Sequence, residues 1–307
     1  MYRRPKDYFL ISLKGIAMGA ADAVPGVSGG TIAFISGIYE ELISTISNVN
    51  LGLFSTLKNE GLGAFWKKLN GNFLLALLAG IIISFVSFMR LAKYLIENQP
   101  ILIWSFFFGL IVASIYYVGK QITKWNLGSI ITLIIGAFIA YYITTLPSLA
   151  SNENSLFLVL AGAIAICAMI LPGISGSFIL VILGAYKTLS DALHDFNFKK
   201  IALFVVGAIF GLLSFSRVLK WLFKHYHNLT LALLTGFIFG SLNKIWPWKK
   251  VLTWRTNSHN EQVPLLEKSI SPFSYEGDNQ IYFALILMMV GFLTIIILEK
   301  LGRKKPN

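Results

Sequence analysis

Two short clusters in the sequence combine proline, glycine and serine in the same order, and they are the residues best suited to bind an anion. They are Pro25-Gly26-Val27-Ser28-Gly29 and Pro172-Gly173-Ile174-Ser175-Gly176. Proline and glycine interrupt helices, so each cluster should form an unwound turn between two half-helices. The first N–H groups of the second half-helix lack partners within the helix, and the helix dipole adds partial positive charge there. Such a turn suits a phosphate or a carboxylate.

Hydroxyl groups in and beside these turns add hydrogen-bond donors. The alternative is a tight turn whose small residues serve only close packing, but the presence of two copies favours the anion site. The candidate anion-binding residues are Ser28, Gly29, Gly30, Thr31, Ser175, Gly176 and Ser177, and the residues expected to shape the turns are Pro25, Gly26, Pro172 and Gly173.

Two arginines are further candidates to bind the same anion. Arg90 and Arg217 each end an apolar segment, and a lysine follows three residues later, on the same helical face. A guanidinium group binds phosphate oxygens with two parallel hydrogen bonds, and an ammonium group adds a point charge. Basic residues at helix ends also extend to lipid headgroups, which is the alternative for both. The repeated pattern Ser-Phe-x-Arg-x-x-Lys favours a role beside the anion.

Asp22 and Glu40 are the acidic residues that could carry a proton or couple its movement to another step. Asp22 lies inside an apolar region, where a carboxylate is costly unless it is paired or hydrated. The alternative for Asp22 is a helix cap or an ion pair with Lys14 or an arginine. Glu40 lies further along the same region and is expected at the membrane interface.

The composition indicates a membrane protein that crosses the bilayer several times. Of the 307 residues, 56% are apolar and 13% are charged, and the mean hydropathy is +0.70. Soluble domains carry about 25% charged residues, so a soluble enzyme, a disordered chain and a disulfide scaffold are excluded. The net charge of +12 arises mostly between apolar runs, which favours contact with anionic lipids over nucleic acid. One cysteine, Cys167, and four scattered histidines predict neither a metal site nor a cofactor.

Apolar segments predict six spans and two re-entrant hairpins. The hairpins, about 12–46 and 156–193, contain the two clusters, and a polar loop is expected at about 247–279. Basic residues fall mainly on one side of this arrangement and favour cytoplasmic N- and C-termini. The predicted spans are Phe73–Met89, Ile101–Val118, Leu127–Leu146, Ile201–Phe215, Leu229–Trp246 and Ile281–Leu298.

The sequence also contains an internal repeat. A shift of 147 residues aligns Gly15–Leu42 with the region of the second cluster, and a shift of 127 then aligns Gly80 with Gly207 and Arg90 with Arg217. We therefore expect two repeats, 1–150 and 151–307, each a re-entrant hairpin followed by three spans. Because three crossings are an odd number, the repeats should be inverted in the membrane, as in many secondary transporters. The expected fold is an all-α polytopic membrane protein.

The first cluster and its flanks resemble a known family signature. Residues 15–31, followed by Gly37-Ile38-Tyr39-Glu40, are similar to the signature of the PopT-type polyprenyl-phosphate transporters, long known only as a membrane domain of unknown function. Residues 171–177 resemble the second signature, and the similarity covers nearly the whole chain. The resemblance implies a transporter, not an enzyme, that recycles undecaprenyl phosphate, the lipid carrier of cell-wall precursors, across the cytoplasmic membrane.

Two other functions are consistent with the same motifs. A membrane lipid phosphatase, such as an undecaprenyl-pyrophosphate phosphatase, also uses inverted repeats and a serine-rich turn. It would need two intramembrane glutamates near its serine and arginine, whereas this sequence offers only Asp22 at depth. A secondary transporter of a small anion would have a cavity closed to lipid, and its binding would not depend on a prenyl tail.

Overall fold

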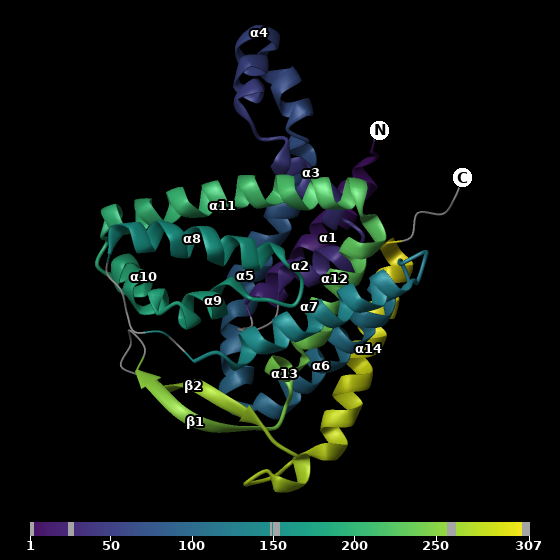
Figure 1. Ribbon diagram of the computed structural model, residues 1–307, viewed down its shortest axis with the longest axis vertical. Coiled ribbons are helices and arrows are strands. Elements are labelled where there is room, and N and C mark those ends of the chain that lie inside the picture. Colours follow the sequence, from purple (N-terminus) through teal and green to yellow (C-terminus); the bar gives the residue numbers. More distant parts are fainter. Residues whose placement is uncertain (1–2, 24–27, 148, 150–153, 257–261, 303–307) are drawn as a thin grey trace.

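The computed structural model describes residues 3–23, 28–147, 149, 154–256 and 262–302, and most of them are helical (Figure 1). A two-stranded antiparallel sheet, β1 (Lys249–Thr256) and β2 (Gln262–Ser269), and a 3₁₀ turn, η1 (Pro272–Ser274), precede the last helix. The helices are α1 (Pro5–Asp22), α2 (Gly29–Ile35), α3 (Tyr39–Ser47), α4 (Leu51–Lys68), α5 (Gly71–Asn98), α6 (Pro100–Gly119), α7 (Leu127–Thr145), α8 (Ser155–Ile170), α9 (Gly176–Ile182), α10 (Ala185–His194), α11 (Phe198–His225), α12 (His227–Gly240), α13 (Leu242–Ile245) and α14 (Ile281–Gly302).

The length and composition of the helices are those of a multi-pass membrane protein. Among the described residues, α6, α7 and α11 are long and apolar enough to cross a bilayer, and two bent helix pairs raise the number to as many as five. The bent pairs are α4 with α5, at 51°, and α9 with α10, at 110°. The predicted number of six full spans stays a prediction. Helix α12, for example, has 14 residues and a length of about 21 Å, shorter than the ~30 Å hydrocarbon core.

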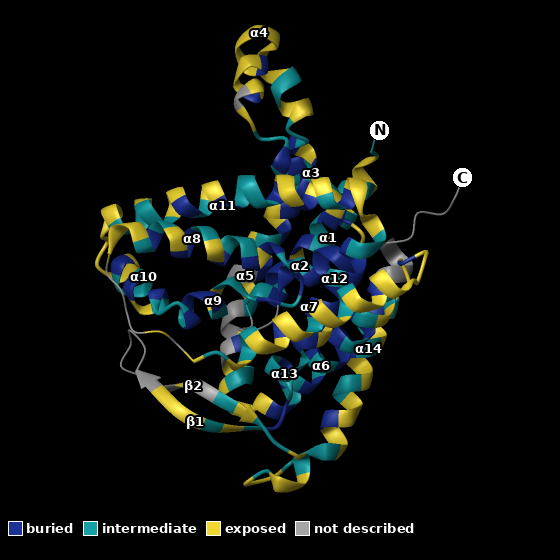
Figure 2. Ribbon diagram, viewed as in Figure 1, coloured by how far each residue is buried: buried dark blue, intermediate teal, exposed yellow. Residues whose placement is uncertain are grey.

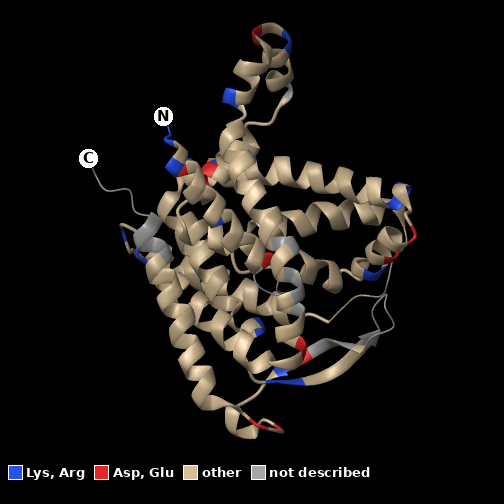
Figure 3. Cartoon of the chain, turned by 180° about the vertical axis from the view of Figure 1, so that it is seen from behind, with Lys and Arg blue, Asp and Glu red and all other residues tan. Residues whose placement is uncertain are grey.

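Apolar side chains cover the outward faces of several helices. Phe138 on α7, Phe210 on α11 and Phe283 on α14 are each more than 60% exposed, and Figure 2 shows exposed residues along the outer faces of these helices. Figure 3 shows charged residues mostly around the outside of the molecule, at α4, near the N-terminus, at the side where α10 meets α11 and near the sheet, with few in the middle. A surface of this kind is unfavourable in water and suits the interior of a bilayer.

Helix packing repeats between the two halves of the chain. Helix α1 packs on α5 and α8 packs on α11, while α6 packs on α14 and α12 packs on α7. The agreement extends to single residues. A Cβ atom on Gly15 would meet the carbonyl oxygen of Leu77, and one on Gly162 would meet that of Phe204. These are the positions that the shifts of 147 and 127 align, so aligned residues make matching contacts in the two halves; the division into two repeats and their inversion in the membrane stay predictions.

Each predicted hairpin consists of three helical pieces. Helices α1, α2 and α3 form the first, and α8, α9 and α10 form the second. The breaks fall at the two clusters, as the proline and glycine residues predict, although Pro25 and Gly26 themselves lie outside the described residues. A second bend follows each short helix, at Gly37 and Gly184, which have positive φ angles of 72° and 70°. Glycine adopts this backbone conformation without steric cost.

One polar segment is more ordered than the sequence analysis predicted. The segment 247–279 was expected to be a loop, but it contains β1 and β2, so the fold is not purely helical. The strands pair in register from Lys249 with Ser269 to Thr256 with Gln262, and Trp248, buried at 2% exposure, anchors their base through a hydrogen bond to the carbonyl oxygen of Asn279.

The sheet and α4 mark opposite ends of the molecule. Helix α4, the start of α1 and the end of α14 lie at one end, and β1 and β2 lie at the other (Figure 1). Helices α1 and α2 lie between these ends, in the buried interior with α6 and α12 (Figure 2).

Candidate functional site

The two predicted turns contact each other. The hydroxyl group of Ser28 donates a hydrogen bond to the carbonyl oxygen of Leu171, at 3.4 Å, and the backbone N–H of Gly173 donates one to Oγ1 of Thr31, at 2.9 Å. Ser28 and Thr31 are buried, with exposures of 2% and 0%. The clusters are therefore brought together across 142 residues of sequence by hydrogen bonds between the hairpins.

The first turn also packs closely on the end of α8. A Cβ atom on Gly30 would lie 2.8 Å from the carbonyl oxygen of Ile170, which is too close for any other residue without a shift of the backbone. The hydroxyl group of Tyr39 donates a hydrogen bond to the same carbonyl oxygen, at 3.1 Å. The small residues of the first turn therefore serve close packing, the alternative considered for this cluster.

Replacing Thr31 by valine is expected to destabilise the protein by about 1 kcal/mol, because the N–H of the half-buried Gly173 would lose its acceptor. Valine has nearly the same shape, so packing should change little. The matched control is Thr235→Val. Thr235 is equally buried, but its hydroxyl donates to the carbonyl oxygen of Leu231 within its own helix, so its loss strands no buried N–H. Thermal unfolding in detergent measures both variants, and equal melting temperatures would contradict the expected role of Thr31.

Asp22 caps the helix that follows the first turn. The backbone N–H of Gly29, the first residue of α2, donates a hydrogen bond to Oδ1 of Asp22, at 2.7 Å. The alternative of a helix cap thus describes the contact that Asp22 makes. An anionic oxygen occupies the start of α2, as expected for a helix N-terminus, but it belongs to the chain itself. The role of Asp22 in coupling stays a prediction.

The second turn is more open than the first. Gly173 has a positive φ of 88°, and the turn leads through Ser175 into α9, whose first residue is Gly176. The hydroxyl oxygens of Ser175 and Ser177 lie 2.9 Å apart, Ser177 is exposed, and the Ser175 side chain does not cap the helix. Of the two turns, within the described residues, the second is therefore the one that a ligand reaches without breaking contacts between the hairpins.

Of the two predicted arginines, only Arg217 has a described side chain. Arg90 lies in α5, but its side chain is outside the described residues. The guanidinium group of Arg217 donates a hydrogen bond to the carbonyl oxygen of Val49, at 2.8 Å, and Lys220 donates one to Oδ1 of Asn48, at 2.9 Å. Both acceptors follow the C-terminus of α3, where positive charge is favourable. Arg217 thus joins α11 to the first hairpin, and its binding of phosphate stays a prediction.

The side-chain contact of Glu40 is with a residue outside both turns. Its carboxylate is 58% exposed and lies 3.1 Å from Nε2 of His227, so it lies at the protein surface, and its position at the membrane interface stays a prediction. Its role in coupling stays a prediction. Within the described residues, no group of three or more His, Cys, Asp or Glu side chains is placed to hold a metal ion.

An apolar groove runs between α8 and α11. Its volume is about 310 Å³, and it opens widely to the surface. Cys167 lines this groove one helical turn before Leu171, where the second turn begins. The residues that line it are Ala163, Ile164, Cys167, Phe210, Gly211, Ser214, Phe215 and Val218.

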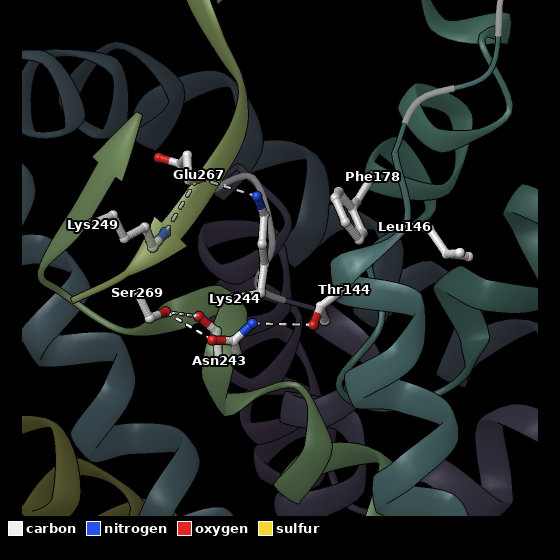
Figure 4. Close-up of a pocket in the computed structure, with 8 residues that line it drawn as sticks. All are labelled: Thr144, Leu146, Phe178, Asn243, Lys244, Lys249, Glu267 and Ser269. Atoms are coloured by element: carbon white, nitrogen blue, oxygen red, sulfur yellow. Dashed lines mark hydrogen bonds and ion pairs between the residues drawn. The ribbon is translucent and has the colours of Figure 1, made fainter. Parts of the chain in front are cut away.

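The sequence analysis gave no role to three charged residues that the sheet brings together. Lys244, Lys249 and Glu267 line a cavity of about 20 Å³ near the end opposite α4, and Phe178 of α9 lines it too (Figure 4). Lys244 and Glu267 are separated by 23 residues, and only the pairing of β1 with β2 places them side by side. No local sequence motif marks such a cluster.

Comparisons with known proteins agree with the family resemblance. The family model described as undecaprenyl phosphate translocase-like matches residues 18–263. A polyprenyl-phosphate transporter of Vibrio cholerae serotype O1 is 46% identical over 99% of this chain and all of the relative. A polyprenyl-phosphate transporter of Staphylococcus aureus is 33% identical over 76% of this chain and 85% of the relative. No solved structure matches the chain. The chain therefore belongs to the undecaprenyl phosphate translocase-like family.

Proposed function

We propose that the chain transports a polyprenyl phosphate, with undecaprenyl phosphate as the substrate, across the cytoplasmic membrane. Both relatives named above are polyprenyl-phosphate transporters. The observation that carries the proposal is the open apolar groove between α8 and α11, whose lining includes Cys167, one helical turn before Leu171 at the start of the second turn. A long apolar tail joined to an anionic head fits this arrangement.

In this proposal the phosphate head binds where the two turns meet. Ser175, Gly176 and Ser177 supply hydroxyl groups and the N-terminal N–H groups of α9, and Ser28 to Thr31 hold the turns together and border the head. The prenyl tail stays in the groove and in the surrounding lipid, so only the head has to cross. Arg90 and Arg217 are proposed as counter-charges when the hairpins rearrange.

We further propose that the two repeats are inverted and expose the head to each side of the membrane in turn. The helix pairs that recur in the two halves support this, because α6 and α12 each pack on the last helix of the other repeat. In many transporters with alternating access, the two inverted repeats pack against each other and move relative to each other around the substrate. Both termini are placed on the cytoplasmic side.

Asp22 is proposed to couple the movement to protons. Its carboxylate occupies the start of α2, so a phosphate that approaches the turns meets a like charge. Protonation of Asp22 would remove that charge and would free the head to bind. Glu40 is the second acidic candidate, at the protein surface.

The function is tested with purified protein and radiolabelled undecaprenyl phosphate. We expect saturable binding that unlabelled undecaprenyl phosphate displaces and that neither undecaprenol nor inorganic phosphate displaces at equal concentration. Displacement by inorganic phosphate would favour a small-anion transporter. Release of phosphate from undecaprenyl pyrophosphate would favour a lipid phosphatase, and either result would overturn the proposal.

The only cysteine of the chain reports on the proposed tail groove. Bound undecaprenyl phosphate is expected to slow the alkylation of Cys167 by N-ethylmaleimide about tenfold when the lipid is present at about nine times its dissociation constant, because only the free fraction reacts. The control carries Cys167→Ala together with Phe138→Cys, on the exposed face of α7, where the rate should not change. An unchanged rate at Cys167 under saturating lipid would place the tail elsewhere.

A further inference from the structure

Two lysines share one carboxylate where the sheet meets the helices (Figure 4). Nζ of Lys244, in α13, lies 3.2 Å from Oε2 of Glu267, and Nζ of Lys249, at the start of β1, lies 3.6 Å from the same oxygen. None of the three residues lies in a helix that is long and apolar enough, within the described residues, to cross a bilayer. With both lysines protonated and Glu267 ionised, the cluster has a net charge of +1.

Lys249 is the unusual member of this cluster. Its side chain is 8% exposed, and among the described residues its Nζ has no hydrogen-bond partner, only the longer ion pair with Glu267. The Trp104 ring lies 4.1 Å from Nζ and offers a cation–π contact. Burial lowers the pKa of Lys249 to about 8, although Glu267 opposes the shift. A buried ammonium group with unused donors is costly unless an anion satisfies it.

The cavity beside the lysines is small and largely polar. Its volume of about 20 Å³ accepts one oxygen-sized group, so an anion would insert one oxygen and keep its remainder at the mouth. Asn243 donates a hydrogen bond to Oγ1 of Thr144, at 3.3 Å, and accepts one from Ser269, at 2.8 Å, which fixes the polar wall. A phosphate group, with several oxygens and a tetrahedral shape, fits this entry.

The cavity is also connected to the second turn. Nζ of Lys244 lies 4.8 Å from the centre of the Phe178 ring, and Phe178 follows Ser177 in the chain. The cavity lies near the end of the molecule that carries the sheet, away from α4 and the start of α1 (Figures 1 and 4). A phosphate held by the lysines would therefore be next to the turn proposed to bind the head.

We propose that Lys244 and Lys249 form a phosphate-binding site that loads the substrate on the face opposite the termini. The identity of the bound phosphate as a lipid head rests on the proposed function, whereas the chemistry of the site, a phosphate between two lysines, does not. The site receives the head first, and the head then passes along Phe178 to the serines of the second turn. Glu267 keeps the lysines in place and limits the affinity, so that the head can leave.

The test measures the binding of three probes to the full-length protein: farnesyl phosphate, inorganic phosphate and farnesol. Lys249→Met removes the charge and keeps a long apolar side chain in a buried position, where such a change is often tolerated. It is expected to weaken farnesyl phosphate binding about tenfold or more, the loss of a charge-assisted hydrogen bond. The matched control is Lys250→Met. Lys250 precedes Val251 on the same strand, is 56% exposed and pairs with the exposed Glu276, so its loss should leave binding unchanged.

A second variant gives a change of the opposite sign. Glu267→Gln removes the carboxylate that competes with the phosphate, and it should tighten binding of farnesyl phosphate. A merely structural role of the cluster would weaken binding in both Lys249→Met and Glu267→Gln, and that result overturns the inference. So does wild-type affinity in a folded Lys249→Met protein.

The probes separate the inference from the proposed function. Binding of farnesyl phosphate that is insensitive to Lys249→Met keeps the proposed function and overturns the loading site. Binding of inorganic phosphate that depends on Lys249, without binding of farnesyl phosphate, supports the phosphate site and overturns the lipid substrate. Farnesol should not bind. If it binds with an affinity that Lys249→Met does not change, recognition of the phosphate head is contradicted.

Discussion

Replacing Gly80 or Gly207 by valine is expected to prevent the protein from reaching its folded state, or to lower its melting temperature by about 5–10 °C. A Cβ atom on Gly80 would meet the carbonyl oxygen of Ser12 on α1, and one on Gly207 would meet that of Val159 on α8. Both obstacles are backbone atoms, so the helices themselves must separate. Overpacking costs about 1–3 kcal/mol or more, and about 2–4 °C follows from each kcal/mol in a chain of 150–250 residues.

The chain offers a control for this prediction. Gly63 in α4 has no heavy atom within 4 Å of an added Cβ, so Gly63→Val should leave the melting temperature within about 2 °C of the wild type. Thermal unfolding in detergent, followed with gel filtration, compares the three variants. Because Gly80 and Gly207 hold matched positions, their effects should be similar. A large effect at only one of them would mean that the repeats do not contribute equally to the fold.

The sequence was most informative where the two halves agree. The shifts that align Gly15 with Gly162 and Gly80 with Gly207 were read from residue types alone, and the structure places each pair at the same helix crossing. Glycine at a crossing lets two backbones approach closely. This requirement falls on single positions, so it is visible in the sequence. The breaks in the hairpins were predictable for the same reason, since proline and glycine act locally.

The sequence was least informative about what the turns do to each other. Ser28 and Thr31 were candidate ligand residues because their hydroxyl groups flank a helix N-terminus, yet both are buried and bond to the second hairpin. The same residue types serve packing or binding, and the choice depends on which segment lies opposite. That information is tertiary and is absent from a local motif.

The lysine cluster was missed for a related reason. Lys249 belongs to a stretch that was expected to be a loop, because its charges and prolines dominate its composition, and Lys244 lies near the end of the predicted span Leu229–Trp246. Pairing of β1 with β2 then places Glu267 beside both lysines and covers Lys249 with Trp104. Strand register over a bulged hairpin follows from interactions between distant residues, so composition could not reveal it.

The opposite environments of the two turns have a functional consequence at Asp22. In the first turn the anion position at the start of α2 is filled by the Asp22 carboxylate, whereas the start of α9 has the half-buried Ser175 and the exposed Ser177 and no counterpart of Asp22, since Met169 holds that position. Two like charges 4 Å apart repel by about 4 kcal/mol at an effective dielectric constant of 20. A bound phosphate and an ionised Asp22 therefore oppose each other where the turns meet.

Asp22→Asn is accordingly expected to bind undecaprenyl phosphate about tenfold more tightly, for a change of ~1.4 kcal/mol, and to transport it more slowly than the wild type. The amide oxygen of asparagine still accepts the hydrogen bond from Gly29, so the cap on α2 persists while the charge is lost. Without an ionisable group at this position, transport into vesicles should also lose its dependence on pH. Asp7→Asn is the control. Asp7 lies at the exposed start of α1, the helix that ends at Asp22, and accepts a hydrogen bond from the N–H of Arg4, at 2.9 Å. Weaker binding in Asp22→Asn, or a pH dependence equal to that of the wild type, would contradict the coupling role and would leave Asp22 as a helix cap alone.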